Sequence, residues 1–211
     1  MTEQLRSHLS PKPPSYYLEH EEGKSPVILL PGIIERWGFL RKIGDAVSQA
    51  GHAVYVVPSL GDNLHTIQDS ARITREVIEK NNLNHVVLIA HSKGGLIGKY
   101  LLVHDNEDGR IDTLIAIATP FSGSPVAGVV PFTPFKELLP GSEVIRELQS
   151  HEEVNGQIVS IFPEFDNHIP SGSYLQGAEN IRIHEKGHHK VLFHSEAVMQ
   201  VLSLLQKSET K

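Results

Sequence analysis

The sequence predicts an α/β fold in which a doubly wound, mostly parallel sheet of about six strands carries helices on both faces. Short apolar runs alternate along the chain with longer segments whose apolar residues recur at helical spacing, and this alternation is typical of βαβ units. The 211 residues are 39% hydrophobic and 21% charged, an ordinary globular composition that suffices for one large core. We therefore expect a single domain over 26–211, preceded by a lead-in over 1–25.

The lead-in and the first strand differ in composition. Three prolines within the first 14 residues predict an irregular lead-in, with one edge strand at 16–19. Residues 26–30 then form an unbroken apolar run that Pro31 and Gly32 close. This pattern predicts a strand that is buried on both faces of a parallel sheet.

The remaining elements follow in alternation. Apolar residues at helical spacing over 37–50, followed by Gly51 as a C-terminal cap, predict the first helix. The further predicted helices cover 69–82, 93–104 and 193–205, and the further predicted strands cover 53–57, 85–90, 111–118, 157–162 and 180–184. Right-handed crossovers between such strands produce a sheet that is covered on both faces.

Residues 121–150 interrupt this alternation. Their prolines and their apolar residues, among them Val129, Phe132 and Leu138, predict a lid-like insertion over the sheet, because so apolar a segment is rarely left in solvent. Two roles stay open. The apolar side chains could line a site for an acyl chain, or they could pack as additional core.

Charge and hydropathy exclude several classes of protein. The net charge of −6 and the lack of a clustered basic segment argue against nucleic acid as a partner, and the absence of Cys excludes thiol catalysis. No apolar run approaches the ~20 residues that cross a bilayer. Residues 1–14 lack the apolar core of a signal peptide, so we expect a cytoplasmic protein unless a leader has been removed. We expect no cofactor and no metal, and the oligomeric state stays open.

Ser92 is the predicted nucleophile. It lies in the segment IAHSKGG at 89–95, which matches the G-x-S-x-G pattern except that Ala90 replaces the first Gly. A nucleophilic serine needs a sharp turn with small flanking residues, and Ala keeps this flank small. Because Ser92 stands between an apolar strand and an amphipathic helix, the helix N-terminus directs free N–H groups to the place where an oxyanion would form.

The backbone N–H groups of Ile33 and Lys93 are the predicted oxyanion-hole donors. Lys93 directly follows the nucleophile, and Ile33 belongs to the loop after the first strand, which supplies the second donor in this arrangement. The simpler alternative is that Pro31 and Gly32 only end a strand. Their combination with Ser92 favours the functional interpretation.

Asp166 and His188 are the predicted acid and base. Each follows a predicted strand beyond Ser92, in the order nucleophile, acid, histidine that this scaffold requires. Glu164 is an alternative acid and His189 an alternative base. The remaining candidates, His168 and His194, are predicted to be solvated or hydrogen-bonded surface residues.

Together these motifs resemble the lipase branch of the α/β-hydrolases, in particular small bacterial lipases and lipase-like carboxylesterases. The resemblance covers nearly all of 26–205, and its motifs are LLPG at 29–32, LIAHSKGGL at 88–96, IATP at 117–120 with GSP at 123–125, the segment 166–170, and GH at 187–188. Pro31 stands where many relatives have His, and Lys93 stands where Met or Gln is usual. Neither departure removes a catalytic atom, because the oxyanion donors are backbone groups. The first strands of larger relatives are missing.

A zinc signature competes with this interpretation. His184, Glu185 and His188 match H-E-x-x-H, in which two histidines one helical turn apart hold zinc and the glutamate activates water. The motif requires a helix, yet it follows the apolar run 181–183 and contains Gly187, which disfavours a helix. A segment that passes from strand to loop and brings His188 to Ser92 explains the same residues.

The resemblance implies a serine hydrolase that cleaves carboxylic esters, with lipid-like or acyl esters as substrates, through an acyl-Ser92 intermediate. An acyltransferase or a thioesterase would keep the same triad. A non-catalytic binding protein on this scaffold is an alternative from another class, because a fold does not fix a function. The expected partner is a small-molecule or lipid ester, and transient contact with a lipid surface stays open.

Overall fold

The computed structural model describes residues 12–130 and 133–208, and its centre is one parallel six-stranded sheet. The strands are β1 (Val27–Leu30), β2 (Val54–Val56), β3 (Val86–His91), β4 (Ile111–Ile117), β5 (Ile158–Phe165) and β6 (Glu179–Lys186). Their order is β2-β1-β3-β4-β5-β6, and every neighbouring pair is parallel. The predicted doubly wound sheet is therefore confirmed.

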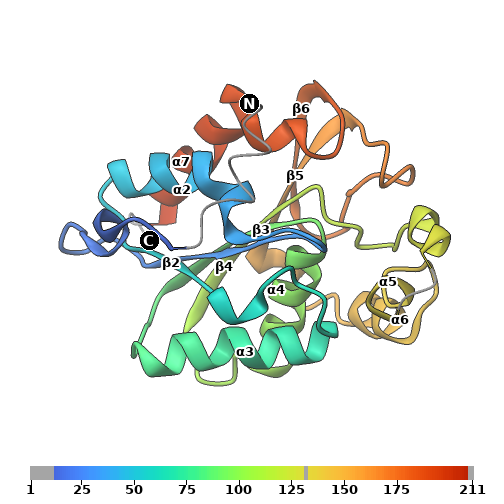
Figure 1. Cartoon of the computed structure of the whole chain (residues 1–211), viewed down its shortest axis with the longest axis horizontal. Coiled ribbons are helices and arrows are strands. Elements are labelled where there is room, and N and C mark those ends of the chain that lie inside the picture. Colours follow the sequence, from blue (N-terminus) through green and yellow to red (C-terminus); the bar gives the residue numbers. More distant parts are fainter. Residues whose placement is uncertain (1–11, 131–132, 209–211) are drawn as a thin grey trace.

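Helices cover both faces of the sheet (Figure 1). The helices α2 (Arg41–Gln49) and α7 (Ser195–Ser208) lie on one face, and α3 (Ile67–Lys80) and α4 (Lys93–His104) lie on the other. Because successive side chains of a strand point to opposite faces, the sheet divides the core into two apolar clusters. All residues of β1 and β3 are buried, as their unbroken apolar runs predict.

Short 3-10 helices connect several of these elements. They cover Ser15–Leu18, Trp37–Leu40, Pro58–Leu60, Pro125–Val129, Asn155–Gln157 and Lys190–Phe193. Helix α3 begins two residues before its predicted start, because the Thr66 side chain accepts a hydrogen bond from the N–H of Asp69 and caps the helix. No described helix combines the length and the apolar character that a membrane crossing requires.

The predicted edge strand at 16–19 is wrong. The chain forms a 3-10 helix there, at Ser15–Leu18, and its Tyr17 side chain is completely buried against α2. The Tyr17 hydroxyl donates to Asp45, and a Cβ atom added to Gly44 would lie only 2.6 Å from it. This segment is thus held by the Tyr17 ring, which packs against Gly44, and not by pairing with a strand.

The insertion over 121–150 contributes side chains to the core and also exposes apolar side chains. It contains a 3-10 helix at Pro125–Val129, α5 (Thr133–Lys136) and α6 (Glu143–Ser150), and Phe132 lies outside the described residues. Ile145 and Leu148 of α6 are buried in the core. Phe121, Ala127 and Leu138 also belong to the core, whereas Val129 is 81% exposed.

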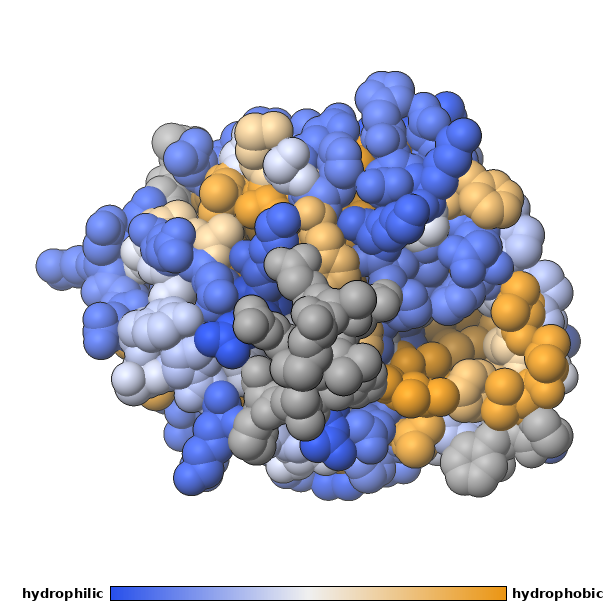
Figure 2. Space-filling model, turned by 45° about the horizontal axis from the view of Figure 1, so that its top comes forward, coloured by the Kyte–Doolittle hydropathy of each residue, from blue (hydrophilic) through white to orange (hydrophobic). Residues whose placement is uncertain are grey.

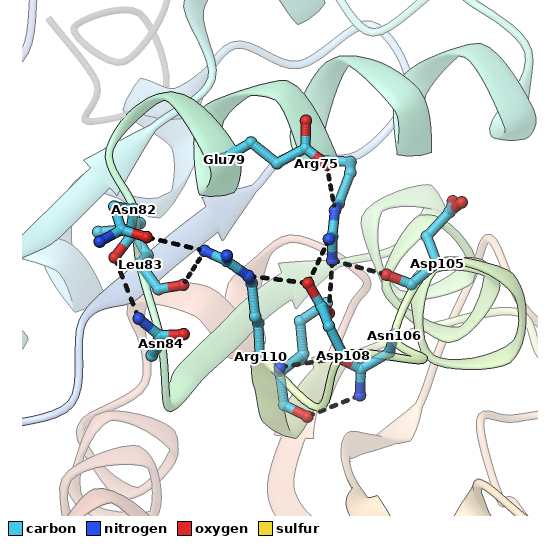
Figure 3. Close-up of polar contacts among 10 residues, drawn as sticks. Arg75, Glu79, Asn82, Leu83, Asn84, Asp105, Asn106, Asp108 and Arg110 are labelled. Atoms are coloured by element: carbon cyan, nitrogen blue, oxygen red, sulfur yellow. Dashed lines mark hydrogen bonds and ion pairs between the residues drawn. The ribbon is translucent and has the colours of Figure 1, made fainter.

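A network of charged side chains joins α3 to the turn before β4, at the amino ends of the strands (Figure 3). Figure 3 shows Arg75 of α3 and Arg110 converging on Asp108, which lies in the turn between α4 and β4. Arg75 donates two hydrogen bonds to Asp108 and one to Glu79, and Arg110 donates a third to Asp108. These hydrogen bonds lower the pKa of the Asp108 carboxyl to about 2.

The order of the strands places a crevice at the opposite edge. The chain turns from β1 outward to β2 and then returns to β3 on the other side of β1, so loops leave the carboxyl ends of β1 and β3 in opposite directions. Ligands of open α/β sheets bind at this kind of position. The loop 31–35 follows β1, and Ser92 follows β3.

Candidate active site

Ser92 occupies a strained turn between β3 and α4. Its φ of 52° and ψ of −120° lie outside the regions that side-chain-bearing residues favour, and such strain is concentrated at functional positions. The N–H group of Ser92 donates to the carbonyl of Ile117, which ties the turn to the neighbouring strand β4. The residue is 7% exposed, so its access is limited to the cavity described below.

Three glycines permit this turn, as the small residues around Ser92 predict. A Cβ atom on Gly94 would overlap the carbonyl oxygen of Leu30, and one on Gly95 would overlap the Thr119 hydroxyl. On the opposite side, a Cβ atom on Gly32 would lie 3.1 Å from that of Ser92. Helix α4 can therefore approach the end of β1 this closely only because Gly94 lacks a side chain, and Gly95 allows the same helix to approach Thr119.

Asp166 and His188 form a buried pair, and His188 lines the same cavity as Ser92. The Nδ1–H group of His188 donates to Oδ2 of Asp166 over 2.8 Å, while Oδ1 accepts from the backbone N–H groups of His168 and Ile169 at 2.8 and 2.9 Å. Burial raises the pKa of Asp166, but the hydrogen bond from His188 and these two N–H groups lower it by more. Asp166 is thus an ionised carboxylate that orients the imidazole of His188.

His188 is suited to accept a proton at its other ring nitrogen. Burial lowers its pKa to about 4, although the hydrogen bond to Asp166 opposes this change. The ring is therefore neutral near pH 7, and because Asp166 holds the proton on Nδ1, the lone pair remains on Nε2. A neutral imidazole with a free Nε2 is the form that a general base requires.

The alternative acid and base have other partners. Oε1 of Glu164 accepts from Nδ1 of His184 at the surface, and Nε2 of His189 lies 3.0 Å from Oε1 of Glu35. The rival zinc motif also lacks its helix, because His184 and Glu185 belong to strand β6 and Gly187 follows with a φ of 119°. The segment 184–188 thus passes from strand β6 into a loop, as the alternative to the zinc motif predicts.

Sequence reasoning missed Glu35, which joins three segments of the site. It is 2% exposed; its Oε2 accepts from the N–H of Gly32 at 2.7 Å and from Nδ1 of His91 at 2.9 Å, and its Oε1 lies 3.0 Å from Nε2 of His189. Burial raises the pKa of Glu35, yet His91 and His189 lower it by more. Its position just after β1 was the only sequence signal.

His91 completes this buried arrangement. Its Nδ1 contacts Glu35, and its Nε2 donates to the carbonyl oxygen of His188 over 3.2 Å. Both partners are acceptors, so both ring nitrogens must carry protons. Burial lowers the pKa of His91, but the charge and hydrogen bond of Glu35 raise it by more. A buried ion pair therefore connects the loop after β1 with the loop that carries His188.

The side chain of Lys93 is directed away from the site. It is completely buried, and its Nζ donates to the carbonyl oxygens of Asn63 and His65. Burial lowers its pKa to about 8, with Glu137 opposing this change. Lys93 does not line the cavity, so its ammonium group anchors the loop at 63–65 and leaves only its backbone facing Ser92.

Glu35, Ser92, His188 and His189 line one cavity of about 670 Å³. Its polar floor is formed by Glu35, Ser92, Ser124 and the rings of three histidines, and its walls are apolar. The lining residues are Ile33, Ile34, Glu35, Phe39, Ser92, Pro120, Ser124, Val126, Ala127, Val129, Val130, Phe135, Leu138, His168, Ile169, His188 and His189. His168, predicted to be a surface residue, lines the same cavity as His188.

The apolar walls continue onto the surface. Figure 2 shows hydrophobic side chains gathered around a hollow at one end of the molecule, the end at which α5 lies in Figure 1. In the segment 126–130, which lines the cavity, the exposed apolar residues are Val126, Val129 and Val130. The cavity thus combines apolar side chains that reach the surface with buried polar side chains such as Glu35 and His188.

The sequence was compared with protein families and with proteins of known function. The family model of the PGAP1-like alpha/beta domain matches residues 52–130, a stretch that contains Ser92 but neither Asp166 nor His188. No protein of curated function matches the sequence.

Several solved structures share the whole fold. The mature lipase of Bacillus licheniformis has a TM-score of 0.69 and 13% identity, with 92% of this chain and 96% of that chain covered. A carboxylesterase of Nitrososphaera gargenis has a TM-score of 0.62 and 15% identity, with coverage of 91% and 93%. An extracellular α/β-hydrolase of a Paenibacillus species has a TM-score of 0.56 and 14% identity, with coverage of 85% and 98%. The chain therefore has the α/β-hydrolase fold.

Proposed function

We propose that the protein is a serine hydrolase that cleaves carboxylic esters through an acyl-Ser92 intermediate. The observation that carries this proposal is that Ser92, on a strained turn, and His188 line the same cavity, while Asp166 holds the far ring nitrogen of His188. Similarity to lipases and carboxylesterases supports the same class of reaction.

In the first half of the reaction, Ser92 Oγ attacks the ester carbonyl while Nε2 of His188 takes the hydroxyl proton. The tetrahedral intermediate then collapses, the bond from carbon to the alcohol oxygen breaks, and His188 returns the proton to the departing alcohol. Asp166 stabilises the imidazolium in between. The product that stays on the protein is the acyl ester of Ser92.

Water completes the reaction. It enters the place of the alcohol, loses a proton to Nε2 of His188 and attacks the acyl carbonyl. The second tetrahedral intermediate releases a carboxylic acid, and the proton returns to Ser92 Oγ. The neutral resting state of His188 allows this residue to act as base and then as acid in each half.

The backbone N–H groups of Ile33 and Lys93 are proposed to hold the oxyanion. The N–H of Lys93 belongs to the first turn of α4, where backbone donors have no partner within the helix. Ile33 lies between Gly32 and Glu35, and the hydrogen bond from the Gly32 N–H to Glu35 fixes this loop. Preorganised donors of this kind contribute about 3 kcal/mol each to the transition state.

The cavity favours an ester with an apolar acyl chain. Val126, Val129 and Leu138 line its walls, and an aliphatic chain gains about 0.8 kcal/mol for each CH₂ group that it buries. We therefore propose lipid-like or acyl esters as the substrate class.

Hydrolysis of p-nitrophenyl esters of increasing chain length tests the proposal. We expect the wild type to hydrolyse them, and we expect Ser92→Ala and His188→Ala to lose at least about 10³-fold in kcat/KM. The matched control is Ser122→Ala, which alters a serine outside the cavity lining and should leave kcat/KM unchanged. A folded Ser92→Ala variant with unchanged activity would refute the proposal.

A further inference from the structure

Three histidine rings cluster at the polar floor of the cavity. The ring centroid of His188 lies 4.6 Å from that of His168 and 5.0 Å from that of His189, and the latter two are 5.3 Å apart. One ring nitrogen of each residue lies within 4.8 Å of the others. The loop after β5 supplies His168, and the loop after β6 supplies the other two. Triple imidazole sets of this kind bind zinc in proteins.

Two of these rings already have the outer partners that metal-bound histidines need. Nδ1 of His188 is held by Asp166 at 2.8 Å, and Nε2 of His189 lies 3.0 Å from Glu35. Both carboxylate side chains are 3% exposed. A carboxylate on the far ring nitrogen fixes the orientation of the imidazole and raises its basicity toward a metal. The nitrogens left for a metal are Nε2 of His188 and Nδ1 of His189.

The charge and geometry of the cluster suit a zinc ion. Two buried carboxylates stand behind the rings of His188 and His189, and imidazole is a preferred ligand of Zn²⁺. Zinc-to-nitrogen bonds of about 2.0–2.1 Å require the three nitrogens to be about 3.4 Å apart in a tetrahedron. The present nitrogens lie within 4.8 Å of one another, so zinc binding requires the side chains to rotate closer together, and all three residues line the cavity.

We propose that His168, His188 and His189 bind one Zn²⁺ ion and that bound zinc switches the hydrolase off. The inhibition part rests on the proposed function. Zinc bound to Nε2 of His188 occupies the lone pair that must accept the Ser92 proton, so Ser92 is no longer deprotonated. The ion is a reversible inhibitor in this arrangement and takes no part in ester cleavage.

Binding is tested first, without any need for activity. Isothermal titration of ZnCl₂ into untagged Ser92→Ala protein is expected to show one site. His168→Ala and His189→Ala, each added to Ser92→Ala, are expected to weaken binding at least about tenfold. The matched control is His184→Ala, because His184 belongs to the rival zinc motif and its side chain is 79% exposed. Circular dichroism verifies that each variant is folded.

Inhibition is tested second, on protein that retains Ser92. ZnCl₂ is expected to abolish p-nitrophenyl ester hydrolysis, and EDTA is expected to restore it. The zinc concentration for half inhibition should rise at least about tenfold in His168→Ala, measured against that variant's own zinc-free rate, and should not change in His184→Ala.

The outcomes separate the two proposals. Absence of zinc binding, or binding that neither His168→Ala nor His189→Ala weakens, would overturn the site. Zinc that binds there but leaves hydrolysis unchanged, or accelerates it, would overturn the switch. If the protein binds zinc through the three histidines but hydrolyses no ester, the metal site stands and the proposed function fails.

Discussion

At the scale of single residues, Glu35 connects more of the candidate site than any residue that the sequence motifs identify. Its two oxygens contact the loop after β1, the residue before Ser92 and the residue after His188. A buried carboxylate with three donors is stable only while those donors remain. Glu35 is therefore expected to position the site without touching the substrate's reacting atoms.

Glu35→Gln should destabilise the fold and slow catalysis. The substitution removes the counter-charge of the buried His91 imidazolium, and loss of one partner of a buried pair costs about 3 kcal/mol. We expect the free energy of unfolding in urea to fall by this order and kcat to fall with it. Glu22→Gln, at an exposed position, is the control. An unchanged free energy of unfolding in Glu35→Gln would show that the pair contributes nothing.

Lys99 predicts a pH dependence of stability. Its ammonium group is buried in α4 and donates to Asn155 over 2.7 Å, and burial lowers its pKa from 10.5 to about 8. Between these two values the unfolded chain binds more protons than the folded one, so stability rises with pH in this window. The raised pKa of the buried Tyr17 has the opposite effect above pH ~10.

Urea denaturation between pH 8 and about 9.5 measures this effect below the range in which tyrosine ionises. The increase in unfolding free energy over this interval should be smaller in Lys99→Met than in the wild type. Lys80→Met, which alters an exposed lysine at the end of α3, should retain the full increase. Equal increases in all three proteins would contradict the assigned cause.

At the scale of elements, the sequence pattern predicts most of the helices and strands because burial controls both. The run at 26–30 became β1, and the residues predicted as 93–104 are helix α4 itself. The error at 16–19 has a different origin. A short aromatic segment can pair with an edge strand or pack one ring against a distant residue. Here the Tyr17 ring packs against Gly44, and the local sequence pattern does not reveal that contact.

The contact between α4 and β1 makes a prediction of its own. Gly94→Ala places a Cβ atom in overlap with the Leu30 carbonyl oxygen, which forces the helix and Ser92 away from the loop at 31–35. We expect a melting temperature lowered by several degrees and at least a tenfold loss, about 1.4 kcal/mol, in kcat/KM. Gly156→Ala is the control, since no atom lies within 4 Å of the added Cβ. Similar behaviour of the two variants would contradict the packing argument.

At the scale of the whole molecule, the order of residues along the chain predicts the three members of the candidate triad but not the residues that contact them. Ser92, Asp166 and His188 follow three different strands, and parallel strands bring their carboxyl ends to one edge. Glu35 and His168 join them from loops, and His91 joins them from the end of β3, through the directions of their side chains. Loop conformation, unlike strand alternation, has no periodic signal in the sequence, so these contacts emerge only in three dimensions.

The central claim is that Ser92 is a nucleophile activated by His188, and covalent labelling tests it most directly. The protein is incubated with an alkyl fluorophosphonate, and intact mass and peptide mapping locate the adduct. We predict one adduct per chain, on Ser92, that is absent from Ser92→Ala and forms at least about 10³-fold more slowly in His188→Ala. An unlabelled wild-type protein, or a label at another residue that persists in Ser92→Ala, would contradict the claim.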